Sequence, residues 1–327
     1  MLLAAISNGN GMSLIAEADD TAIPANGMAS TLAACAQNYA PCSCNMDTAN
    51  GNAITVTCMN VADALAIRTA FERVTDMNIF KFEYYHTALA SANLPADLFS
   101  DKKVSQIHIG CPKTDGTCQQ LTLTVDANAF RFTRRTTLEV HLRYVTFDAA
   151  ATFDFLRGFE VATTLIVDNY RQIPLVALNG PTTWVDTMTA LTTLAFTNGL
   201  DTSLGADLFP DVTPAQLLKL NLTGSKLNDD AINNKILLSL AASSSASTIE
   251  YLGLGGNMLT LVPKRLQSFS KVKVLDMGSN DNIPTIGQSR LNFPTPPTSV
   301  DLQKNKITSI ENGAFVGTSF PFLFSII

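Results

Sequence analysis

Histidine is the residue type in this sequence best suited to proton transfer or metal binding near neutral pH, and the chain contains three, at positions 86, 108 and 141. His108 and His141 each stand in a short stretch where apolar and polar residues alternate. If these stretches are neighbouring strands of one sheet, both rings face the same side and lie close together. The pattern shows no acidic residue at ligand spacing beside them. We therefore expect histidines that contact solvent or a partner, and no bound metal.

Other catalytic patterns are missing from the sequence. It has no G-x-S-x-G nucleophile turn, and GLGGN at 253–257 lacks the third glycine of a dinucleotide-binding loop. We predict a protein that is not an enzyme, with no catalytic residue and no cofactor.

The six cysteines indicate an oxidising compartment, because they are even in number and four lie close together. Those four are Cys35, Cys42, Cys44 and Cys58. Their spacing alone allows three disulfide pairings. The other two, Cys111 and Cys118, bracket the polar stretch PKTDGT, which suggests a small insertion closed by a disulfide. We predict a secreted or extracellular protein.

The composition narrows the class of partner. Hydrophobic residues make up 46% of the 327 positions and charged residues 15%, whereas about 25% is typical for charged residues. The net charge of -6 comes without any run of Lys or Arg, which argues against a nucleic-acid partner. No stretch of about 18 apolar residues occurs, so no membrane span is expected within this chain.

A repeat of apolar residues organises the second half of the chain. Residues 217–227 have leucine at the positions of L-x-x-L-x-L, with a further leucine behind, as in the strand segment of a leucine-rich repeat. The same frame returns at 249–259, 272–280 and 300–307, and weaker copies lie at 191–196 and 165–167. The weakest copies centre on the pairs Phe80 and Phe82, Ile107 and Ile109, and Val140 and Leu142.

The repeat length supports a solenoid. The second apolar position of each unit falls at residues 165, 194, 220, 252, 275 and 300, at intervals of 29, 26, 32, 23 and 25 residues, near the usual 20–29. We predict an α/β solenoid: a leucine-rich-repeat horseshoe with a parallel sheet on its concave face, stabilised by stacking of neighbouring units. Asn257, Asn280 and Asn305 recur at one position and should form a ladder of side-chain hydrogen bonds. The longer units leave room for helical turns in 182–193 and 229–240.

The concave face is where solenoids of this class usually bind partners, and alternate strand positions supply its side chains. Candidate binding residues are Lys81, Glu83, His108, His141, Arg143, Asp168, Tyr251, Asp276, Asp301 and Gln303. The early strands are richer in aromatic and ionic groups. Asn221 lies on the same face and begins the sequon Asn221-Leu222-Thr223. A glycan at Asn221 would leave the early strands as the binding surface.

Three segments are expected. Residues 1–34 are a leader or disordered segment, 35–75 a cysteine-rich cap with ITVTC as a capping strand, and 76–327 an array of about nine repeats. No cysteine follows Cys118, and PFLFSII begins like a further repeat, with Leu323 and Ile326 in frame. We therefore expect an array that is incomplete at its C-terminus.

Several segments in this order resemble a known group of proteins: PCSCNMDTANGNAITVTC, NLPADLFSDKKVSQIHI, VDANAF, FDFLRGF and ENGAF. The first resembles the cap of extracellular leucine-rich-repeat proteins, which implies that Cys35 pairs with Cys44 and Cys42 with Cys58. The whole set resembles crustacean secreted leucine-rich-repeat proteins similar to the non-catalytic subunit of Oplophorus-luciferin 2-monooxygenase. That resemblance implies an accessory chain associated with a separate catalytic subunit, and it transfers no catalytic residue.

The expected function is therefore that of a secreted, non-enzymatic scaffold for protein–protein binding, with an accessory subunit of a luciferase-like complex as its specific form. The alternative is the ligand-binding ectodomain of a cell-surface receptor whose membrane anchor is missing from this chain. Co-purification of a small catalytic chain would favour the first, and an anchor in the full-length transcript the second.

Overall fold

The computed structural model describes residues 35, 37–48, 53–88, 90–112, 118–147, 153–171, 187–200 and 216–315, and the backbone of 324–325. The segment 1–34, expected to be a leader, lies outside these residues.

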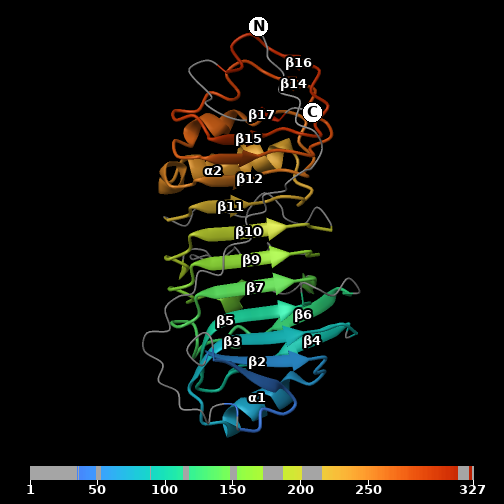
Figure 1. Ribbon diagram of the computed structural model, residues 1–327, viewed down its shortest axis with the longest axis vertical. Helices are drawn as coiled ribbons and strands as arrows, with labels where there is room; N and C mark the ends of the chain where they lie inside the picture. The colour runs from blue at the N-terminus through green and yellow to red at the C-terminus, as the bar shows by residue number, and fades with distance from the viewer. Residues whose placement is uncertain are drawn as a thin grey trace.

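One sheet of twelve strands runs along the long axis of the molecule, with its strands stacked in chain order (Figure 1). The strands are β1 (Ser43–Asp47), β2 (Ala53–Met59), β3 (Asn78–Tyr85), β5 (Lys103–Gly110), β7 (Glu139–Arg143), β9 (Thr164–Asp168), β10 (Thr193–Thr197), β11 (Lys219–Asn221), β12 (Tyr251–Gly253), β13 (Val274–Asp276), β15 (Ser299–Asp301) and β17 (Phe324–Ser325). The first two pair antiparallel, and every later neighbour pairs parallel. The chain is a solenoid of parallel strands, as the leucine-rich-repeat pattern predicts.

The strand register confirms the repeat frame. The second apolar position of each predicted unit lies opposite its counterpart on the next strand, and the six positions read from the sequence are all correct. These residues are Leu165, Leu194, Leu220, Leu252, Leu275 and Val300. Each is buried because alternate side chains of a strand point to the same side, here the core. The parallel sheet is observed, whereas the curvature of a horseshoe stays a prediction.

Short elements in the returning half of each unit close the other side of the core. They are β4 (Ser91–Leu94), β6 (Leu121–Val125) and β8 (Val145–Phe147) in one small parallel sheet, β14 (Thr285–Ile286) and β16 (Ser309–Ile310) in another, and the helical turns η2 (Phe153–Leu156), η5 (Asp230–Ile236), α2 (Leu237–Ala241), η6 (Ser244–Ser247) and η7 (Lys264–Ser268). The turns η5 and α2 confirm the helical stretch expected in 229–240. Of the other expected stretch, residues 182–186 lie outside the described residues, and 188–192 form a turn and a connection to β10.

Aromatic side chains fill the core in the N-terminal half, where the leucine pattern is weak. The ring of Phe99 lies 4.7 Å from that of Phe82 and 5.6 Å from that of Phe130. The prediction that Phe80 and Phe82 form the inward pair is half wrong, because Phe80 is partly exposed and Tyr84 takes the second buried place. Two successive residues of β3 leave the core between Ile79 and Phe82, so strict alternation fails there.

The asparagine ladder is confirmed in the C-terminal half. The Oδ1 of Asn280 accepts a hydrogen bond from the backbone N–H of Asn257 (3.0 Å), and the Oδ1 of Asn305 accepts one from the N–H of Asn280 (3.1 Å). Asn257 in turn accepts from the N–H groups of Ser225 and Leu227 at 3.1 and 3.0 Å. Each amide thus satisfies backbone groups at the bend of the preceding repeat.

The cap consists of the β1–β2 hairpin and α1 (Ala64–Arg73), whose N-terminus is capped by the side chain of Asp63 accepting from Leu65 N–H. The disulfides are Cys35–Cys44, Cys42–Cys58 and Cys111–Cys118. The first two are those implied by the family resemblance, and the third is the pair expected around the insertion, whose residues 113–117 are not described.

At the other end, β17 differs from expectation. Phe324 lies opposite Val300, whereas the frame with Leu323 and Ile326 places Ile326 there. The apolar run offers inward residues in more than one register, so leucine spacing alone could not select one. Within the described residues, no helix combines the length and apolar character that crossing a membrane requires.

Candidate functional site

The open face of the main sheet, defined as the side opposite the core, carries the predicted binding residues. The strand register and the burial of the alternating residues place every one of them there, on a strand or just after it. They are Lys81, Glu83, His108, His141, Arg143, Asp168, Tyr251, Asp276, Asp301 and Gln303, and the predicted glycosylation residue Asn221 lies on the same face. Placement on this face is an observation, and their role in binding stays a prediction.

The register divides these residues into two groups. Glu83, His108 and His141 lie opposite one another on β3, β5 and β7, and Arg143 lies opposite Asp168 on β9. We call the side chains of β3, β5 and β7 on this face the early-strand patch. It comprises Lys81, Glu83, Tyr85, Gln106, His108, Glu139, His141 and Arg143. The second group, on β12 to β15, is separated from it by the small side chains of Thr193, Ala195 and Thr197 on β10.

Glu83 holds its side of the patch in place. Its carboxylate accepts hydrogen bonds from Thr57 Oγ1 at 2.8 Å and from the hydroxyl of Tyr85 at 3.3 Å, and it lies 3.4 Å from the ammonium of Lys81. Burial, and then the negative charge of Glu83, raise the pKa of the Tyr85 phenol. Three neighbouring side chains are therefore ordered before any partner arrives.

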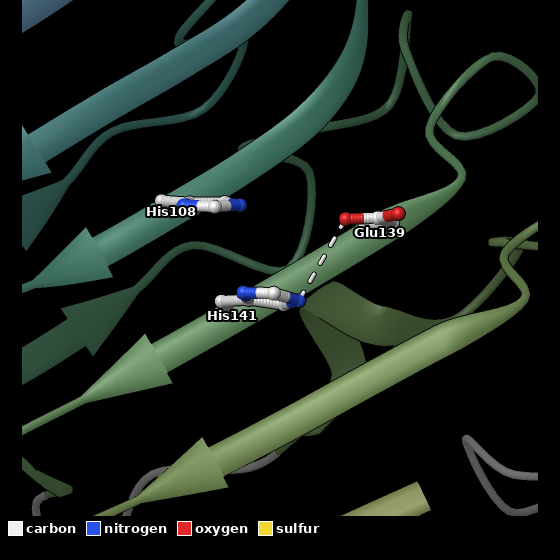
Figure 2. A group of neighbouring side chains, drawn as sticks. All are labelled: His108, Glu139 and His141. Carbon is white, nitrogen blue, oxygen red and sulfur yellow. Dashed lines mark ion pairs between the residues drawn. The ribbon is translucent and has the colours of Figure 1, made fainter. Parts of the chain in front are cut away.

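The two histidines stack on each other because they are direct cross-strand neighbours (Figure 2). Their ring centres are 4.3 Å apart with an interplanar angle of 17°. Burial, followed by the charges of His141, Lys81 and Arg143, lowers the pKa of His108 to about 2. Its imidazole is consequently neutral at physiological pH.

Glu139 is the residue that the sequence argument overlooked. It stands two positions before His141, so both project from the same face of β7, and its Oε2 lies 3.8 Å from His141 Nε2 (Figure 2). The statement that no acidic residue stands at ligand spacing is thus wrong. The alternation in EVHLR at 139–143 was the signal that could have revealed it.

Arg143 is the second cation of the patch, beside Lys81. Its register neighbour Asp168 already accepts hydrogen bonds from Thr197 Oγ1 at 2.6 Å and from the amide of Asn198 at 2.9 Å. In the part of the chain that the structure describes, the guanidinium of Arg143 forms no ion pair.

The face of the later strands is shaped by glycine. A Cβ at position 253 would lie 2.5 Å from the Oδ1 of Asn221, and one at 255 would lie 2.6 Å from the Oδ1 of Asp276. Tyr251 lies under the ammonium of Lys219, which is 5.0 Å from its ring centre, and burial raises the Tyr251 pKa to about 12. Burial also raises the pKa of Asp276, with Asp301 adding to the effect. The side chains of Asn221 and Asp276 thus fill the space beside positions 253 and 255.

The sequence matches no protein-family model and no curated protein. Among solved structures, it is similar to an internalin from Listeria monocytogenes at 12% sequence identity and a TM-score of 0.40, over 79% of this chain and 86% of that one. So distant a likeness adds nothing to the fold and the site, which rest on the register and contacts described above.

Proposed function

We propose that this chain is a non-enzymatic scaffold that binds a polypeptide partner on the early-strand patch. The observation that carries the proposal is a set of ionic, aromatic and imidazole side chains on one face of a hydrogen-bonded sheet. Because those side chains are already held by neighbours such as Glu83, binding would cost little additional side-chain entropy. A solenoid sheet presents such a set as one extended surface.

The partner should offer a carboxylate to Arg143. This guanidinium is held by a strand, is only partly exposed and lacks an ion pair among the described residues, so it can form a bidentate contact with a carboxylate. A charge pair that becomes desolvated at the centre of an interface is sensitive to charge reversal.

The test compares two charge reversals. The wild-type chain is used to capture a partner from secreted material, and the partner's dissociation constant is then measured for wild type, Arg143→Glu and Arg265→Glu. Arg265 lies exposed on η7, away from the sheet, and is the matched control. Arg143→Glu should weaken binding by at least about tenfold, while Arg265→Glu should leave it within about twofold. Equal affinity of wild type and Arg143→Glu would place the binding surface elsewhere.

The more specific form of the proposal is an extracellular accessory subunit of a luciferase-like oxidoreductase. It is supported by the family resemblance and by the three disulfides, which suit an oxidising compartment. It predicts that a distinct catalytic chain co-purifies with the scaffold. The purified scaffold chain alone should not oxidise the luciferin. Luciferin oxidation by the purified chain would refute the non-enzymatic assignment.

A further inference from the structure

The geometry points to a site for a divalent transition-metal ion of the zinc class, formed by His108, Glu139 and His141 on the open face of β5 and β7. One donor atom from each side chain lies within 4.8 Å of the other two, and all three residues are partly buried. In the described part of the chain, no other group of three histidine, cysteine or acidic side chains meets this condition. The inference does not depend on the proposed polypeptide partner.

The donor set suits such an ion. Imidazole nitrogen and carboxylate oxygen are the ligands that Zn²⁺ takes in two-histidine, one-glutamate sites. The six cysteines are all in disulfides and do not compete for the metal. Two cations of the patch act on His108: Lys81, which is paired with Glu83 at 3.4 Å, and Arg143.

The required movement is small. Bond lengths near 2.0–2.1 Å in a tetrahedral site put donor atoms about 3.3 Å apart. The donors must therefore approach by at most about 1.5 Å from their present separation of up to 4.8 Å. The two stacked rings are nearly parallel, so their nitrogen lone pairs do not converge on one point. One imidazole must therefore also tilt before both can bind the same ion. Both rings project from the open face and turn about side-chain bonds, so the backbone of β5 and β7 need not move.

His108 supplies a second, independent reason. Its Nε2 is buried and has no hydrogen-bond partner among the described residues. A buried polar atom without a partner is uncommon in native proteins and calls for a ligand, a water or an ion. A metal bound by this nitrogen would satisfy it.

The site would leave part of the coordination sphere open. All three ligands come from one face of a sheet, so the far side of the ion faces away from the strands. Such an ion would keep at least one exchangeable position for water or for a ligand from a bound molecule.

The test uses the whole chain with its disulfides intact, without an affinity tag and stripped of metal by a chelator. Calorimetric titration with Zn²⁺ should show one equivalent bound. His108→Gln, His141→Gln and Glu139→Gln should each lower the affinity by more than about tenfold, because losing even an outer-shell partner costs that much. Glu250→Gln is the matched control, since Glu250 is an exposed glutamate paired at 2.8 Å with Lys273 and lies far along the sheet.

The third histidine provides an internal control that needs no variant. Zn²⁺ should shift the ring signals of His108 and His141 in an NMR spectrum of the wild-type chain and leave those of His86 in place. Absence of Zn²⁺ binding, an affinity unchanged in the two histidine variants, or a shift confined to His86 would each overturn the inference. If a variant fails to fold, the NMR titration of the wild-type chain with Zn²⁺ is sufficient to test the site.

Discussion

Replacement of Asn280 by alanine tests whether the asparagine ladder stabilises the solenoid. Asn280 is fully buried, and its Oδ1 accepts from the N–H groups of Asn257 at 3.0 Å and Leu259 at 3.4 Å. Its Nδ2 donates to the carbonyl groups of Leu254 at 3.1 Å and Met277 at 2.9 Å. Alanine removes all four bonds without changing a charge.

The size of the destabilisation depends on which backbone groups lose their last hydrogen-bond partner in Asn280→Ala. The carbonyl of Leu254 keeps a hydrogen bond from Asn257 Nδ2, and that of Met277 keeps one from Asn305 Nδ2. The N–H groups of Asn257 and Leu259 lose the bonds described above. Two buried donors without partners cost about 1–3 kcal/mol each, and the bond to Leu259 is long, so we expect Asn280→Ala to lower the free energy of unfolding by about 2–5 kcal/mol.

The matched control is Asn305→Ala. Its Oδ1 accepts from the N–H of Asn280 at 3.1 Å, and it is partly exposed, so water can replace the lost partner. We expect Asn305→Ala to lower the free energy of unfolding by about 1 kcal/mol. Urea unfolding followed by circular dichroism gives the free energies, and amide hydrogen exchange should show faster exchange at positions 257 and 259 in Asn280→Ala. Unchanged exchange at those two amides, or a larger loss in Asn305→Ala, would refute the reasoning.

Three further outcomes are expected. Burial lowers the pKa of His86 from 6.5 to about 4. Between these two pH values the unfolded chain binds a proton at this residue and the folded chain does not, so the free energy of unfolding falls by up to about 3 kcal/mol as pH drops from 6.5 to 4. The difference between the free energies of unfolding in urea at pH 7 and pH 4.5 should be smaller for His86→Leu than for wild type. Gly110→Ala should destabilise the chain by about 3 kcal/mol or more, because φ is +122° and a Cβ would lie 1.7 Å from the carbonyl oxygen of Arg143; a melting temperature equal to that of wild type would contradict this. Asn221, whose Oδ1 accepts from Thr223 Oγ1 at 2.6 Å on the open face, should carry a glycan in chain produced by secretion, and an unmodified Asn221 peptide in mass spectrometry would contradict glycosylation at this site.

Leucine spacing predicted the second half of the fold because each leucine of the pattern must point from its strand into the core. Leu220 and Leu252 are buried, lie opposite one another and are followed by Ser225 and Asn257 at equivalent positions of the bend. A shift of one residue would expose every leucine of a strand, so the register is strongly determined by the sequence.

The same reasoning was weaker where aromatic residues replace leucine. In β3, Ile79, Phe80, Phe82 and Tyr84 are all apolar enough to be buried, and spacing alone does not say which of them is left out. The structure selects Phe82 because its ring packs against Phe99 from the returning segment, 4.7 Å away. Contacts of this kind depend on chain far from the strand.

The sequence by itself determined which residues of β9 to β15 face the core, which asparagines form the ladder and which side chains lie on the open face. These follow from alternation and repeat length, which act within one unit or between successive units. Only the tertiary structure decided how closely the Glu139 carboxylate approaches the two imidazoles, that Arg143 forms no ion pair among the described residues, and that Phe324 rather than Ile326 lies opposite Val300. Those facts depend on side-chain rotamers and on the register of degenerate strands, where several arrangements bury similar apolar area and the sequence pattern cannot choose among them.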